Sequence, residues 1–359
     1  MLLSACGISE PRDVVGDNVL WDVPGEMSTM PLVVDSLLIG GLVDGRLVAF
    51  DRRNGRIVWQ TKFPVEFRSE RLLRVGNTLI VANLALHGVD ARTGAVTWTY
   101  GGTGGDAGIV TPGLSGDTVY VAGYLGGDAA ALEAATGRVL WQAQIQQTVF
   151  CPTITESLAL YPTRNLGQSG ALVALDRLTG EERWRRVLPD SANFPGGTVY
   201  GGAVAGDRVV LGTYTSRVLA LSLADGALRW EQVGGSPTTA PYHAAPRVTG
   251  SNVLFTRGDA VLEGRSAADG TLQWSLKIGG SLTSTPSPCA PYLCLAQGRV
   301  WIIDPSGKIV WAFGGGSEIV FLSNVVVDAD GVMYAGVVRA NRTGGVRAFR
   351  PPVAVGATP

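Results

Sequence analysis

The stretch Leu172–Trp184 reads LVALDRLTGEERW and contains the pattern that decides the fold. It begins with an apolar run, passes through the polar turn Asp176–Gly180, and ends on a second run that carries Trp184. The Asp side chain can accept hydrogen bonds from the backbone that follows it, and glycine adopts a positive φ without strain. The stretch therefore predicts a β-hairpin with a large aromatic side chain on its second strand.

The same Gly-to-Trp spacing of four residues recurs along the chain. Neighbouring Trp residues lie 37 to 46 residues apart, which is the length of one four-stranded blade of a β-propeller. We therefore interpret each Gly and Trp as structural, with the Trp ring packed in the gap between blades. The repeats are Gly55–Trp59, Gly94–Trp98, Gly137–Trp141, Gly180–Trp184, Gly226–Trp230, Gly270–Trp274 and Gly307–Trp311.

The two ends of the chain decide the number of blades. Before the first repeat lies one strand, Asn18–Val23, which carries Trp21 in the position of an outer-strand Trp. Three strands and no fourth follow the last repeat, near Phe321–Asp328, Gly331–Val338 and Gly345–Arg350. Together these four strands make one more blade, and such closure removes the open sheet edges.

The sequence thus predicts an all-β, eight-bladed propeller whose last blade is closed by the N-terminal strand. Seven blades is the alternative, if the poorly matched segment Ser191–Gly202 or the N-terminal strand behaves differently. We expect a truncated lipoprotein signal and linker over residues 1–16, the propeller over 17–352, and a tail over 353–359.

Composition narrows the classes of function. Hydrophobic residues are 46% and charged residues 16% of the chain, which disfavours disorder. No run reaches the roughly 18 apolar residues of a membrane-spanning helix. The net charge of -1 and the lack of a Lys/Arg stripe give nucleic-acid binding little support. The pairs Arg52-Arg53 and Arg185-Arg186 are interpreted as solvated surface.

The repeats resemble the PQQ-type, or quinoprotein-like, β-propeller repeat family over roughly Asp17 to Arg350. In size and architecture the chain is similar to the outer-membrane lipoproteins that serve as non-enzymatic subunits of bacterial β-barrel assembly. The resemblance implies a scaffold in the cell envelope whose partners are a barrel-assembly subunit or unfolded barrel proteins. Dehydrogenases and sensor domains share this repeat, so the fold alone does not decide the function.

The N-terminus carries a short motif of its own. Leu3-Ser4-Ala5-Cys6-Gly7 resembles a bacterial lipobox, in which small residues precede a cysteine that becomes lipid-modified. Only five residues precede Cys6, without a charged or a long apolar region. Either the true start lies upstream of Met1 and Cys6 anchors the protein on the periplasmic side of the outer membrane, or Cys6 is a chance cysteine.

The remaining cysteines fit structural roles. Cys289 and Cys294 flank Ala-Pro-Tyr-Leu, which is typical of a hairpin loop. Cysteines on paired strands there would lie within disulfide range, and an oxidising compartment favours the bridge. The alternative is two unpaired cysteines on opposite faces. Cys151 is interpreted as a small buried hydrophobe.

No catalytic, cofactor-binding or metal-binding residue is predicted. The Cys-Cys dipeptide frequent in PQQ-dependent dehydrogenases is absent, and no local motif matches their Asp base or Ca²⁺ ligands. The two histidines, His87 and His243, limit acid–base and metal chemistry. Asp328-Ala329-Asp330-Gly331 lacks the further ligands of a calcium loop and predicts a β-turn.

We therefore expect a monomeric, non-enzymatic scaffold within a complex, which needs no cofactor. The alternatives are a PQQ- and Ca²⁺-dependent dehydrogenase, a PQQ-binding protein, and an extracytoplasmic sensor or interaction propeller. Partner contacts are expected on the longer segments between blades, one of which carries Phe194. These segments are Phe63–Arg71, Gly101–Gly108, Leu188–Tyr200 and Gly234–His243.

If the repeat Trp residues are structural, truncating one should destabilise the whole domain. We expect Trp141→Ala to lower the free energy of unfolding by about 3–5 kcal/mol, as large core truncations do. Urea unfolding measures this cost. A variant that unfolds at the parent's midpoint would contradict a structural role.

Overall fold

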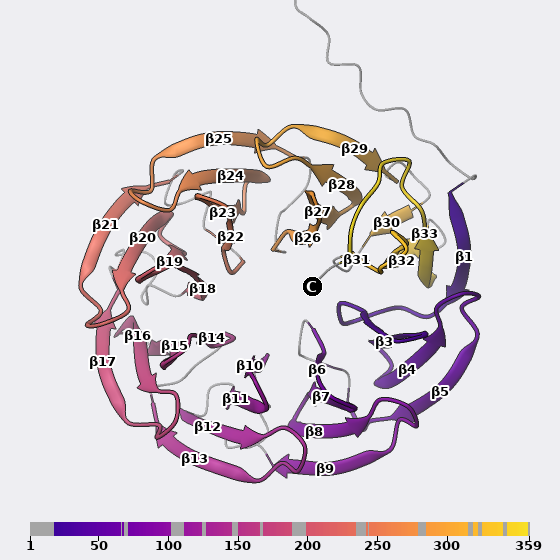
Figure 1. The fold of residues 1–359 in the computed structure, drawn as a ribbon, viewed down its shortest axis with the longest axis horizontal. Coiled ribbons are helices and arrows are strands. Elements are labelled where there is room, and N and C mark those ends of the chain that lie inside the picture. The colour runs from indigo at the N-terminus through magenta and orange to yellow at the C-terminus, as the bar shows by residue number, and fades with distance from the viewer. Residues whose placement is uncertain are drawn as a thin grey trace, which may run out of the picture.

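The computed structural model is a closed ring of eight sheets around a central axis (Figure 1). It describes residues 18–65, 67, 71–101, 111–123, 127–145, 150–165, 168–188, 199–234, 242, 244–278, 285–314, 319–321, 325–339 and 343–357. In blades 1 to 7 the first strand lies nearest the axis and the last strand lies on the perimeter. Over these residues no helix is long and apolar enough to cross a membrane.

The strands follow one another in chain order within each blade. Blade 1 contains β2 (Leu32–Val34), β3 (Leu37–Gly41), β4 (Arg46–Asp51) and β5 (Ile57–Lys62), and blade 2 contains β6 (Leu73–Val75), β7 (Thr78–Ala82), β8 (Ala85–Asp90) and β9 (Val96–Gly101). Blade 3 contains β10 (Gly113–Ser115), β11 (Thr118–Ala122), β12 (Asp128–Glu133) and β13 (Val139–Gln144), and blade 4 contains β14 (Thr153–Ile154), β15 (Leu158–Asn165), β16 (Gln168–Asp176) and β17 (Glu182–Val187). Blade 5 contains β18 (Val199–Ala205), β19 (Arg208–Thr213), β20 (Arg217–Ser222) and β21 (Leu228–Val233), and blade 6 contains β22 (Arg247–Thr249), β23 (Asn252–Arg257), β24 (Val261–Ser266) and β25 (Leu272–Lys277). Blade 7 contains β26 (Ser287–Cys289), β27 (Tyr292–Gln297), β28 (Arg299–Ile303) and β29 (Ile309–Phe313).

Blade 8 is built from both ends of the chain, as the sequence predicts. Its strands are β30 (Ile319–Phe321), β31 (Val326–Val327), β32 (Met333–Arg339), β33 (Gly344–Phe349) and, on the perimeter, β1 (Val19–Pro24). Trp21 lies opposite Ala348 in the antiparallel pairing of β1 with β33. The strand expected at Phe321–Asp328 is two short pieces instead, because β30 and β31 pair with different parts of β32.

The repeated Gly and Trp meet across the gap between blades. A Cβ atom added to any of the seven repeat glycines would lie 2.4–2.8 Å from the Trp ring of the preceding blade. These glycines also have positive φ angles, so the turn needs glycine for its backbone and for the space above it. The Trp rings are buried or half-buried; Trp21, Trp141, Trp184 and Trp311 are the buried ones.

The Trp indoles also tie neighbouring blades together by hydrogen bonds. In six cases the Nε1–H donates, over 2.8–3.3 Å, to the carbonyl of the second residue in the turn of the next blade. The turn of blade 7, Asp304–Gly307, is one residue shorter than the others. Trp274, whose ring covers this turn, has a buried Nε1 without a hydrogen-bond partner.

The contact predicts different costs for two similar glycine substitutions. Gly180 and Gly116 both have positive φ angles, but only Gly180 lies beneath a ring, 2.7 Å from Trp141. Both substitutions with Ala carry a backbone cost of about 1–2 kcal/mol. Gly180→Ala should cost about 1–3 kcal/mol more, because the methyl group overpacks the gap between blades.

Urea unfolding of the two variants measures that difference. Gly116 serves as the control because no atom lies within 4 Å of its added Cβ. Equal midpoints for Gly180→Ala and Gly116→Ala would contradict a steric role for the Trp–Gly contact.

Candidate functional site

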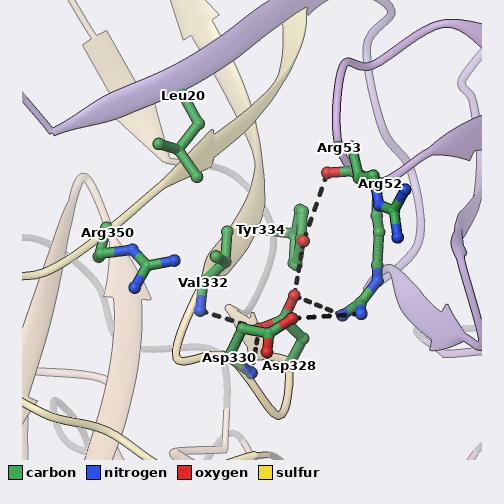
Figure 2. A pocket seen from close by; sticks show the side chains of 8 residues that line it. All are labelled: Leu20, Arg52, Arg53, Asp328, Asp330, Val332, Tyr334 and Arg350. Atoms are coloured by element: carbon green, nitrogen blue, oxygen red, sulfur yellow. Dashed lines mark hydrogen bonds and ion pairs between the residues drawn. The ribbon is translucent and has the colours of Figure 1, made fainter.

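A pocket lies at the junction of blades 8 and 1, where the two chain ends meet (Figure 2). One side chain, Asp328, is buried at its base and receives hydrogen bonds from both blades. The lining residues are Leu20, Arg52, Arg53, Asp328, Asp330, Val332, Tyr334 and Arg350.

Both carboxylate oxygens of Asp328 are occupied. Oδ1 accepts the backbone N–H groups of Asp330 and Val332, each at 2.9 Å, which closes the turn between β31 and β32. Oδ2 accepts hydrogen bonds from Arg52 Nη1 at 2.6 Å and from the Tyr334 hydroxyl at 2.8 Å. Burial, aided by the Asp328 carboxylate, raises the pKa of Tyr334, which therefore stays protonated and donates. Residues Asp328 to Gly331 form a β-turn, as predicted from the sequence.

Arg52 joins the first blade to the last. Its guanidinium pairs with Asp328 and, at 3.3 Å, with Asp330, while its carbonyl accepts the Trp21 indole N–H at 2.8 Å. The prediction that Arg52 is solvated surface is therefore wrong, since its side chain is only 22% exposed. The Trp21 and Tyr334 rings pack beside this contact with centroids 5.9 Å apart. These contacts hold the first and last blades together.

Another ion pair holds the closing strand itself. Arg347 on β33 pairs with Asp22 on β1, and the Arg347 side chain is only 10% exposed. Beyond these strands the Arg350 backbone N–H donates to the Asn18 carbonyl at 2.8 Å. Backbone hydrogen bonds and the Arg347–Asp22 ion pair thus join β1 to β33, and the Arg52–Asp328 ion pair joins blade 1 to blade 8.

Blade 6 contains a buried polar cluster that the sequence analysis missed. Glu263 accepts hydrogen bonds from Tyr242, Arg257 and Arg265, and Tyr242, Glu263 and Arg265 are all buried. Burial alone would raise the pKa of Glu263, but the hydrogen bonds from the two arginines hold it below its ordinary value. Gly264 lies opposite Trp274, and Arg265 comes directly after it. In the other repeats the residue at the position of Arg265 is apolar, so the sequence already marked this strand as an exception.

Cys289 and Cys294 are joined by a disulfide with a Cα–Cα distance of 5.8 Å. They are not directly opposite each other, since Cys289 faces Tyr292 across the hairpin. The Ala290 carbonyl inside this hairpin accepts the backbone N–H of Gly356. The bridged hairpin therefore holds the segment that follows the last strand.

That C-terminal segment covers Trp311. Blade 8 has no hairpin turn between β33 and β1, because these strands come from opposite chain ends. Val353 and Val355 pack instead against the cluster of buried residues that contains Trp311, Cys289 and Cys294. Val353 and Val355, in the segment predicted as a tail, thus pack against the ring.

The other residues considered in the sequence have structural roles or lie outside the described residues. His87 contacts Thr99, Asn83 and the Phe63 ring, and burial lowers its pKa. Cys151 is half-buried. Cys6, Phe194, His243 and most of the predicted contact segments fall outside the described residues. Within the described ranges no group of His, Cys, Asp and Glu side chains is arranged to hold a metal ion.

Most of the chain matches one known protein family. Residues 13–150 and 168–313, well over half of the chain, match the family described as outer membrane protein assembly factor BamB. The chain belongs to the BamB family. This match agrees with the resemblance to PQQ-type repeats. The eight blades of the structure likewise confirm the predicted fold.

Relatives and solved structures carry the same name at modest identity. A BamB from Nitrosomonas eutropha is 32% identical over 48% of this chain and 38% of its own length, and one from Yersinia pestis is 25% identical over 49% of each. The chain thus spans about half or less of the length of these two relatives. The crystal structure of BamB from Moraxella catarrhalis has a TM-score of 0.67 at 16% identity, covering 92% of this chain and 98% of that one. At that identity the likeness shows the fold alone.

The ion pair between Arg52 and Asp328 predicts different stability costs for two Asp-to-Asn substitutions. Asp328→Asn removes the charge that Arg52 needs and leaves a partly buried guanidinium without its strongest partner, so we expect a loss of about 3–5 kcal/mol. Asp44→Asn removes the exposed partner of Arg46, and such a pair contributes about 0–1 kcal/mol.

Thermal and urea unfolding of both variants measure the contrast. The Asp328 variant should also expose Trp21, which packs beside Tyr334 at this junction. If Asp328→Asn costs no more than Asp44→Asn, the Arg52–Asp328 ion pair does not hold blades 1 and 8 together.

Proposed function

We propose that this protein is a non-enzymatic scaffold of the cell envelope that holds partner proteins during the assembly of outer-membrane β-barrels. The observation that carries the proposal is the family match, which runs from before β1 to the end of blade 7. The relatives from Nitrosomonas and Yersinia are named as outer membrane protein assembly factors. The partners we propose are a barrel-assembly subunit and unfolded barrel chains.

The architecture suits a scaffold on physical grounds. At seven junctions a Trp ring of one blade packs on a glycine of the next, ion pairs join blades 1 and 8, and the two chain ends share the sheet of blade 8. A ring tied at every junction keeps its surface segments in fixed relative positions while their sequences vary. A rigid platform lowers the entropic cost of binding a partner.

We also propose that Cys6 is lipidated and that the protein faces the periplasm from the outer membrane. The lipobox-like Leu3–Cys6 precedes the closing strand β1 by a linker of about a dozen residues. One acyl chain binds membranes only marginally, so firm anchoring requires the several chains that a bacterial lipoprotein cysteine carries. The disulfide between Cys289 and Cys294 fits an oxidising compartment.

A sensor or interaction propeller is the second candidate. The serine/threonine-protein kinase AfsK of Streptomyces griseus is 29% identical over 42% of this chain and 19% of its own length. The same repeat therefore occurs attached to a kinase. Under this alternative the ring would bind a signalling ligand rather than assembly partners.

A mild-detergent pull-down from envelope fractions tests the proposal. The tagged protein, produced with its native upstream sequence, should co-purify with a large outer-membrane barrel subunit. The Cys6→Ser variant, which lacks the lipidation site but keeps the ring, should fold normally and lose membrane retention. Recovery of the unmodified protein alone from the cytosol would overturn both the anchor and the scaffold.

The dehydrogenase alternative has its own assay. We expect no saturable PQQ binding and no dye reduction when PQQ, Ca²⁺ and a panel of alcohols or aldoses are added to the purified protein. Dye reduction that depends on PQQ and Ca²⁺ would show a quinoprotein enzyme instead. Intact-protein mass spectrometry, run in parallel, reports the state of Cys6.

A further inference from the structure

The perimeter of the ring consists of the outermost strand of each blade. Each of these strands pairs on its inner side only, and its outer edge pairs with no described strand. Such an edge presents unpaired N–H and C=O groups to any other extended chain. Proteins usually protect exposed edges with charged residues or proline, because an unprotected edge recruits further strands.

Most of the outer strands carry this protection. Charged residues lie in β5, β17, β21 and β25, and β1 has both Asp22 and Pro24. β17 is the most heavily charged, with the sequence ERWRRV. Only β9 (VTWTYG), β13 (VLWQAQ) and β29 (IVWAF) have neither charge nor proline.

These three strands differ in what covers them. In β29 the residues Trp311, Ala312 and Phe313 are all buried, and the preceding Val310 packs on the same cluster as Val353 and Val355. β9 and β13 have no such cover among the described residues, and their exposed apolar side chains include Val96 (45%), Val139 (37%) and Leu140 (43%).

β9 and β13 also lie next to each other on the perimeter. They belong to blades 2 and 3, and Gln142 on β13 donates a hydrogen bond to the Tyr100 hydroxyl on β9 at 2.9 Å. Arg138, just before β13, is paired with Glu133. The two strands therefore form one uncharged stretch of the perimeter, bordered by the heavily charged β17 and by Lys62 at the end of β5.

We propose that β9 and β13 are docking edges for an extended segment of a partner chain, which adds to either sheet as a fifth strand. Unpaired backbone groups on an edge are complementary to another extended backbone, and added strands gain affinity from main-chain hydrogen bonds. The edges carry no charge, so the segment they fit is uncharged and alternates apolar and polar residues. Strands of outer-membrane barrels have this alternation. The inference rests on the proposed function and names the part of the surface that contacts the unfolded barrel chain.

A peptide of alternating Val and Thr residues, about ten residues long as membrane-spanning β-strands are, serves as the probe. It is added to the full-length protein, and amide hydrogen exchange is followed by mass spectrometry. Exchange should slow over residues 96–101 or 139–144 and stay unchanged over β17 and β21. A Val/Thr peptide of the same length with proline at every third position should give no protection.

Matched substitutions locate the edge. Val96 and Val139 each lie two residues after their repeat glycine, as do Leu228 and Leu272 on the charged strands β21 and β25. The double variant Val96→Lys/Val139→Lys should weaken peptide binding by at least about tenfold, which corresponds to roughly 1.4 kcal/mol. Leu228→Lys/Leu272→Lys should change it by no more than about twofold, as surface substitutions away from a contact do. Leu140→Lys alone replaces the first variant if that variant fails to fold.

Three results would overturn the docking edge: protection outside β9 and β13, equal weakening by both double variants, or wild-type dimers in sedimentation that the Val96→Lys/Val139→Lys variant abolishes. The last result would make a second copy of this chain the occupant. The envelope pull-down separates the two levels of the proposal. Loss of peptide binding with intact co-purification refutes the edge, whereas peptide binding without an envelope partner refutes the proposed function.

Discussion

The contact between the Trp of one blade and the Gly of the next is the constraint on which the rest of the structure depends. The indole ring of the Trp needs a flat surface to pack on, and a Cβ atom at the repeat glycine would lie within 2.8 Å of the indole atoms. The indole N–H usually finds a carbonyl in the same turn. Because blades 1 to 6 each cover a glycine and offer one, the spacing between their sheets is repeated around the circle. This repetition positions every strand of the perimeter.

A closed ring has one junction that the chain cannot make by continuing. At that junction β1 completes the sheet of blade 8, and Arg52 reaches back from blade 1 to the buried Asp328. A further adaptation lies one blade earlier, where Trp311 has no hairpin turn to cover and the C-terminal segment packs there instead. The end of that segment is held by the disulfide-bridged hairpin through Ala290. Charge, sheet pairing and a cross-link thus replace the missing turns.

The blades and their closure could be predicted because the signal is local and repeated. Asp176, Gly180 and Trp184 lie within one hairpin, and the same pattern fixes the length of each blade. The partner of Arg52 could not be read in this way, since Asp328 lies 276 residues away and only the closed ring brings them together. Arg265 carried a readable signal, since it is a polar residue at a position that is apolar in the other repeats, but nothing in the nearby sequence indicates that Tyr242 belongs to the same cluster.

The outer strands are unequally protected, and the proposed docking edges rest on this difference. A structural repeat has no need to vary the charge of its edges, yet β17 carries four charged residues and β9 and β13 carry none. The repeat sets the position of each edge, and the residues between the repeated Gly and Trp contacts decide whether that edge repels or accepts another strand.

All of these features require that the ring is closed in solution by its N-terminal strand. Native-state hydrogen exchange, resolved to single amides, tests this closure directly. The amides of β1 and β33 should exchange with the same opening free energy as those of β19 and β20, and they should lose this protection together when Trp21 is replaced by Ala. Exchange of β1 at the rate of a free peptide, with the other blades still protected, would show an open ring.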